Sequence, residues 1–138
     1  AVLIMVMAAS AMAGGAIYVS GGSAIDGYDP VAYFTEGRPV EGQDDFTHEW
    51  MGATWRFANA ANRDAFVRDP ENYAPQYGGY CAWAVSQNYT ASGDPEQWSV
   101  VDGKLYLNYG ASVKATWLKD VPGHIESGDK NWPGLMNK

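Results

Sequence analysis

Residues 46–57 read FTHEWMGATWRF, and this stretch sets the expected fold class. In its first half, Phe, His and Trp alternate with polar residues, which is the period of a strand with one buried face. Met51-Gly52 is a candidate turn, and Thr54–Phe57 would pair back as a second strand. The stretch therefore predicts a β-hairpin that places His48 on the same face as two aromatic side chains.

A second hairpin is predicted further along the chain, where residues 98–109 read WSVVDGKLYLNY. Asp102-Gly103 separates the apolar runs Trp98–Val101 and Leu105–Tyr109, and Asp-Gly in that position is a strong hairpin signal. A further short strand is expected over Val31–Phe34, because a turn-forming Tyr-Asp-Pro sequence precedes it.

The segments between and after the hairpins predict short helices. Asn59 is a reasonable N-cap for a helix that runs to Arg68, with Ala61, Ala65 and Phe66 on its inner face. Residues 112–120 predict a second helix, and residues 123–127 predict one further helical turn. The sequence thus indicates a small single α+β domain with two β-hairpins and two or three short helices.

The composition excludes several classes of protein. The chain has 138 residues, a net charge of −7, one cysteine and two histidines, and it contains six Trp, nine Tyr and four Phe. This length supports one domain with an aromatic hydrophobic core. One cysteine excludes an intramolecular disulfide and a zinc site made of thiolates alone. The acidic balance argues against a nucleic-acid partner, since phosphate binding needs clustered Lys and Arg.

An apolar segment precedes the expected domain. Residues 1–22 contain no Asp, Glu, Lys or Arg, and the first charged side chain is Asp26. The pattern is typical of a signal peptide with a small-residue cleavage site, and residues 1–19 alternatively have nearly the length of a membrane anchor. Both interpretations place the domain outside the cytoplasm, in the periplasm, and the second also gives it a membrane association.

Cys81 is the most informative single residue. It follows two glycines and lies among aromatic residues in QYGGYCAW, residues 76–83. An unpaired cysteine in an exported protein is buried, reactive, bound to metal or used between chains. A small buried hydrophobe is the simplest of these alternatives.

His48 is the natural partner to consider for Cys81, although a packed histidine is the simpler interpretation. Thiolate and imidazole together favour copper(I) or zinc over harder cations, and two protein ligands suffice for copper(I) but leave a tetrahedral zinc site short. A Cys-His pair also suits nucleophilic catalysis, but no orienting residue or oxyanion hole is evident. His124 and Met51 are weaker ligand candidates, and the acidic residues around Asp44 and Asp94 have no calcium-loop spacing.

Six blocks of the sequence resemble the YHS-domain proteins, specifically the exported, stand-alone group. They are Gly27–Phe34 (GYDPVAYF), His48–Trp50 with Gly52–Phe57 (HEW and GATWRF), Asn62–Asp64 with Phe66, Asp69–Ala82 (DPENYAPQYGGYCA), Val101–Tyr109 (VDGKLYLNY) and Asn131–Pro133 (NWP). The resemblance covers nearly all of residues 26–133, so we assign these to a YHS domain, residues 1–22 to the signal or anchor, and 134–138 to a tail.

The resemblance implies a treble-clef-like fold of the TRASH type, which is associated with the sensing, trafficking and resistance of heavy metals. Related exported proteins carry selenocysteine at the position of Cys81, which implies a reactive or metal-binding role for this residue. TRASH domains generally use several cysteines, whereas this chain has one. A complete zinc knuckle is therefore not expected.

These observations lead to three functional hypotheses. The first is an exported protein, not an enzyme, that binds a soft heavy metal, copper(I) foremost, through Cys81 with His48 as second ligand, for trafficking or sensing. The second is a metal-free interaction module or accessory subunit of a membrane or periplasmic complex, which docks through Tyr73, Tyr77, Tyr80, Trp83 and Trp98. The third is a redox protein that uses Cys81 alone.

Overall fold

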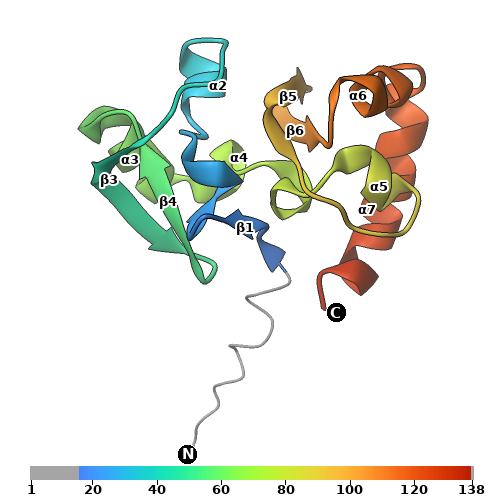
Figure 1. The fold of residues 1–138 in the computed structure, drawn as a ribbon, viewed down its shortest axis with the longest axis horizontal. Coiled ribbons are helices and arrows are strands. Elements are labelled where there is room, and N and C mark those ends of the chain that lie inside the picture. The colour runs from blue at the N-terminus through green and yellow to red at the C-terminus, as the bar shows by residue number, and fades with distance from the viewer. Residues whose placement is uncertain (1–15, 138) are drawn as a thin grey trace, which may run out of the picture.

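Two antiparallel hairpins form most of the β structure in the computed structural model, which describes residues 16–137 (Figure 1). Strands β3 (Gln43–Trp50) and β4 (Ala53–Phe57) pair with His48 opposite Trp55. Strands β5 (Asp94–Val101) and β6 (Lys104–Asn108) pair with Val101 opposite Lys104. Both predicted hairpins are therefore confirmed, and their turns fall at the expected residues.

A third, very short hairpin was not predicted. It joins β1 (Val19–Ser20) to β2 (Ser23–Ala24) through two glycines. The described residues also contain six α-helices and two 3₁₀ turns: α2 (Ala32–Thr35), α3 (Ala60–Arg68), α4 (Pro70–Tyr73), α5 (Ala82–Ser86), α6 (Ala111–Leu118), α7 (Val121–Leu135), η2 (Ile25–Gly27) and η3 (Gln76–Gly79). The α+β class is confirmed, and the treble-clef likeness stays a prediction.

The segment expected to be a strand at Val31–Phe34 is helical, and Asp29 explains why. Asp29 is fully buried, and its Oδ1 accepts hydrogen bonds from the backbone N–H groups of Val31 at 2.8 Å and Ala32 at 3.3 Å. An acidic side chain that accepts from the following amides starts a helix, so the apolar run becomes α2.

Asp29 also links α2 to the end of strand β4 and to α3. Its Oδ2 accepts from the N–H of Ala58 at 2.9 Å and from Nδ2 of Asn62 at 2.7 Å. Asn59 caps α3 as predicted, accepting from the N–H of Asn62 at 2.8 Å. Because Asn62 faces the buried carboxylate, it takes the inner position that was expected for Ala61, which is exposed.

Helix α7 is much longer than the single turn predicted at residues 123–127. Its interior contains Pro133 and three glycines, which lower helix propensity. Tertiary packing offsets this cost, because Ile125, Trp132 and Leu135 pack into a buried cluster. Gly128 is required by this packing, since a Cβ there would lie 2.5 Å from the hydroxyl oxygen of Tyr77.

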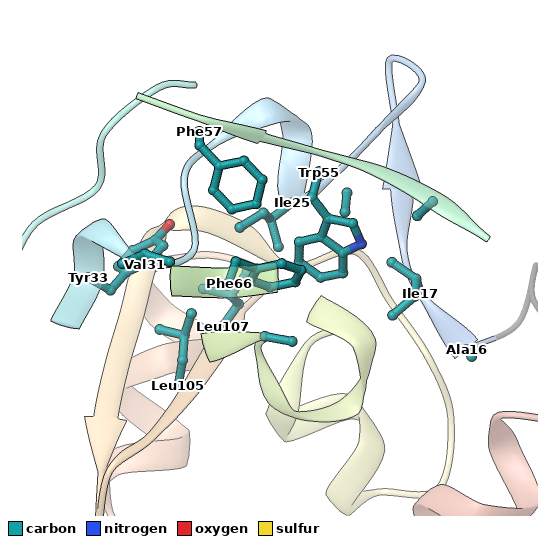
Figure 2. Packing of buried hydrophobic residues seen from close by; sticks show 13 residues of the cluster. Ala16, Ile17, Ile25, Val31, Tyr33, Trp55, Phe57, Phe66, Leu105 and Leu107 are labelled. Atoms are coloured by element: carbon teal, nitrogen blue, oxygen red, sulfur yellow. The ribbon is translucent and has the colours of Figure 1, made fainter. Parts of the chain in front are cut away.

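Two hydrophobic clusters hold the structure together. The first lies between the β3–β4 hairpin and α3, and Phe66 contacts the rings of Trp55 at 5.0 Å and Phe57 at 5.2 Å between centroids (Figure 2). The second lies beneath α5, α6 and α7 and includes Tyr77, Ala82, Val85, Tyr106, Trp117 and Leu135. Strand β6 joins the clusters, because Leu105 and Leu107 face the first and Tyr106 faces the second.

Part of the segment assigned to a signal peptide or anchor belongs to the packed domain. Ala16 and Ile17 are each 4% exposed in the first cluster, and the N–H of Tyr18 donates to the carbonyl of Gly78 at 2.9 Å. The domain thus extends ahead of the expected boundary at residue 26. The prediction for residues 1–15 lies outside the described residues. Within residues 16–137, none of the helices has the length and apolarity needed to cross a bilayer.

Candidate functional site

The backbone around Cys81 is fixed on both sides. The preceding turn η3 is left-handed at Tyr77 (φ 58°) and Gly78 (φ 63°), which reverses the chain within two residues. The N–H of Cys81 donates to the carbonyl of Ala91 at 2.8 Å, and its carbonyl accepts from the N–H of Val85 at 3.1 Å as α5 begins. Cys81 therefore occupies a defined position at the junction between η3 and α5.

The Cys81 thiol has one polar partner among the described residues. Its Sγ lies 3.5 Å from Oδ1 of Asn108, and Cys81 is 1% exposed. The same Oδ1 accepts from the N–H of Trp83 at 2.9 Å, so the orientation of the Asn108 amide is set by the backbone. Since Oδ1 can only accept, the thiol is the donor in this hydrogen bond.

A small pocket is lined in part by Cys81. Its volume is about 190 Å³, and six residues line it: Cys81, Trp83, Tyr89, Ala91, Tyr109 and Val113. The rings of Trp83 and Tyr89 pack edge to face, with their centroids 6.3 Å apart. Tyr89 and Tyr109 are 47% and 59% exposed and form the rim. The pocket therefore places a small space, bordered by exposed tyrosines, next to a cysteine that is itself almost inaccessible to water.

His48 lies on a different element from Cys81. It is half-buried on β3, with its ring edge toward Phe66 at 6.3 Å between centroids. Cys81 precedes α5, and β3 and α5 are on opposite sides of the molecule in Figure 1. The predicted face shared by His48 and its two neighbouring aromatics is confirmed, but the structure does not bring His48 and Cys81 together.

The other candidate ligands have structural partners. Nδ1 of His124 lies 3.0 Å from the carbonyl oxygen of Trp117, at the start of α7. Met51 is an exposed turn residue, as expected. Asp44 forms an ion pair with Arg56 at 2.6 Å, and Asp94 accepts from the N–H of Glu96. Within residues 16–137, no three His, Cys, Asp or Glu residues gather in a way that could hold a metal ion.

The five aromatic residues proposed as one docking surface are divided between the two clusters. Tyr73 and Trp98 pack against the first, whereas Tyr77, Tyr80 and Trp83 belong to the second. The exposed aromatic side chains near Cys81 are instead Tyr89 and Tyr109. The sequence did not single out these two residues, because their local pattern does not distinguish a tyrosine at the edge of a pocket from one in an ordinary exposed loop.

Asn108 was also missed as a functional residue. It ends strand β6, where the apolar run of residues 105–107 stops, and it is fully buried. Its Nδ2 has no hydrogen-bond partner among the described residues. The one local signal for Asn108 is that a polar residue directly follows the apolar run of residues 105–107.

Comparison of the chain with protein-family models, with curated proteins and with solved structures gives no match in any of the three. The resemblance to YHS-domain proteins accordingly stays a prediction from the sequence blocks.

Proposed function

We propose that the protein is a non-enzymatic binding protein of the YHS type whose cargo is a soft, thiol-seeking metal ion, copper(I) foremost. The observation that carries the proposal is that Cys81, which is 1% exposed, is one of the residues that line a small pocket together with Trp83, Tyr89 and Tyr109. As an exported protein it would hold or deliver the ion outside the cytoplasm.

The donor set favours copper(I) over zinc. One thiolate with no second protein ligand in its pocket is far from the four ligands of a structural zinc site. Copper(I) accepts low coordination numbers and prefers sulfur, so one thiolate and one ligand from an incoming carrier can complete its shell. His48 is not required in this proposal, because its contacts are with Phe66 on another element.

Metal binding at Cys81 is coupled to loss of its proton. The ligand form is the thiolate, whereas the thiol in this structure donates to Asn108. The S–H bond and the hydrogen bond to Asn108 are therefore both given up as the metal–sulfur bond forms.

The experiment is a competition titration of the anaerobic protein against a chromogenic copper(I) chelator. We expect one equivalent to bind the unaltered protein, and Cys81→Ser to abolish this binding because it removes the sulfur donor that the described residues supply to the pocket. His48→Asn serves as the matched control and should bind as the unaltered protein does. Equal weak binding by the unaltered protein and Cys81→Ser would contradict the proposal.

A metal-free docking module is the second candidate, and one observation favours it. The thiol already donates a hydrogen bond within the protein, and two exposed tyrosines line a pocket of about 190 Å³. If Cys81→Ser binds no less copper(I) than the unaltered protein, while Tyr109→Ala disrupts capture of a defined partner, this candidate replaces the first.

A further inference from the structure

A second cleft of the described structure is larger than the Cys81 pocket and separate from it. Its volume is about 500 Å³, within the usual range for small-molecule sites. One face of α7 forms a wall, because Asp129, Trp132, Pro133 and Met136 follow helical spacing. The tip of the β3–β4 hairpin, the segment from α4 to η3, and Ala16 with Ile17 ahead of β1 complete the lining. Segments distant in sequence therefore converge on it.

The side chains in this cleft combine aromatic faces with negative charge. Trp50, Tyr77 and Trp132 supply aromatic surface, and the exposed carboxylates of Glu71 and Asp129 lie among them. No Lys, Arg or His of the described residues lines the cleft. The chain as a whole carries a net charge of −7, which attracts cations to such a site.

One carboxylate and two rings are held in a fixed arrangement. The hydroxyl of Tyr77 donates to Oδ1 of Asp129 at 2.9 Å, and the ring of Tyr77 lies 5.9 Å from that of Trp132 between centroids. Burial raises the pKa of Tyr77 well above its usual value, so the hydroxyl stays a neutral donor. Asp129 keeps its second oxygen for another partner, since a carboxylate accepts several hydrogen bonds.

Backbone strain supports this arrangement. Tyr77 is a buried non-glycine residue in the left-handed region, a costly conformation that is found disproportionately at functional sites. The conformation directs the Tyr77 ring under α7, where Gly128 leaves room for it.

We propose that this cleft binds a small organic cation of the alkylated ammonium class. Aromatic faces attract such cations through their quadrupoles, and a nearby carboxylate adds a direct electrostatic contact. An anion would meet two carboxylates with no compensating charge. A neutral apolar ligand would cover those carboxylates without offering them a positive charge or a hydrogen-bond donor. The site shares no lining residue with the Cys81 pocket, so it does not depend on metal binding.

The test is isothermal titration calorimetry of the full chain with choline chloride and, in parallel, with its neutral isostere 3,3-dimethyl-1-butanol. We expect choline to bind and the isostere, which has the same shape without the charge, to bind much more weakly. Asp129→Asn keeps an acceptor for Tyr77 but removes the charge, and should weaken choline about three- to tenfold. Asp45→Asn makes the same change of net charge at an exposed position on β3 and should leave binding unchanged.

Two results would overturn the proposal. One is binding of choline and the neutral isostere with equal affinity, which would make the cleft an apolar site. The other is absence of binding heat for choline at tens of millimolar. Cys81→Ser should retain choline binding, so that failure of the metal proposal and failure of this one are distinguishable.

Discussion

The thiol of Cys81 and the side-chain oxygen of Asn108 lie 3.5 Å apart inside the protein, and this contact joins the η3–α5 turn to the end of strand β6. The Asn108 oxygen also accepts the N–H of Trp83, so one buried amide holds both the thiol and the first turn of α5. These two hydrogen bonds satisfy the Asn108 oxygen, whereas its Nδ2 is buried without a partner among the described residues.

Replacement of Asn108 by Leu should destabilise the protein. It leaves the N–H of Trp83 without its acceptor in a buried region, and one such loss costs about 1–3 kcal/mol. Urea unfolding followed by tryptophan fluorescence measures the free energy of unfolding. Asn137→Leu, at an exposed position, is the control and should change it by less than about 0.5 kcal/mol. A change no larger for Asn108→Leu than for the control would show that the amide does not hold the turn.

Asp29→Asn should cost more than Asn108→Leu. The carboxylate accepts from four N–H donors, and an amide at this position would turn an NH₂ group toward two of them. Each donor left unpaired costs about 1–3 kcal/mol, so we expect a loss of about 3 kcal/mol or more, or failure to fold. The matched control is Asp45→Asn on the exposed face of β3. Similar stability of the two variants would refute the anchoring role of Asp29.

Gly78→Ala should loosen the contact between the segment ahead of the β1–β2 hairpin and the rest of the domain. A Cβ at residue 78 would lie 1.8 Å from the carbonyl oxygen of Ala16, and φ is 63° there. Gly37 has a similar φ of 70° but open space around it, so Gly37→Ala tests the backbone strain alone, about 1 kcal/mol. Amide hydrogen exchange at Tyr18 reads the difference. We expect faster exchange in Gly78→Ala only, and equal exchange in both variants would disprove the close packing.

Stability should fall in alkaline solution through Tyr106. Burial raises the pKa of its hydroxyl to about 12 from the usual 10.0. The unfolded chain loses this proton first as the pH rises, so the folded state is favoured fully below about pH 10 and progressively less between about pH 10 and 12. Urea unfolding at several pH values in this range measures how steeply the free energy of unfolding falls with pH. Tyr106→Phe should flatten this pH dependence, whereas Tyr109→Phe, at an exposed position, should not.

Both central hairpins were predictable because their signals are local. Alternation in residues 46–50 and Asp-Gly at residues 102–103 act within a few residues of the turns they specify. Helix α2 and the length of α7 were not predictable in this way. Asp29 redirects an apolar run into a helix through its own buried hydrogen bonds, and α7 extends past Pro133 because distant residues pack against it.

The candidate site was predictable in one residue and not in its surroundings. Cys81 could be singled out because it is unpaired and follows two glycines. Its contact with Asn108 spans 27 positions of sequence, and the rim tyrosines come from two separate loops. The pairing with His48 rested on chemistry alone, and chemical suitability carries no information on distance.

The most direct test of the copper(I) proposal is to locate the ion on the protein. Copper(I) is diamagnetic, so amide chemical shifts of the ¹⁵N-labelled protein can be followed through an anaerobic titration. We predict that the shifts concentrate at Trp83, Ala91, Tyr109 and Val113, which surround the thiol, and that Cys81→Ser removes them. Shifts centred on His48, His124 or Met51, or shifts that persist in Cys81→Ser, would contradict the assignment of the Cys81 pocket as the metal site.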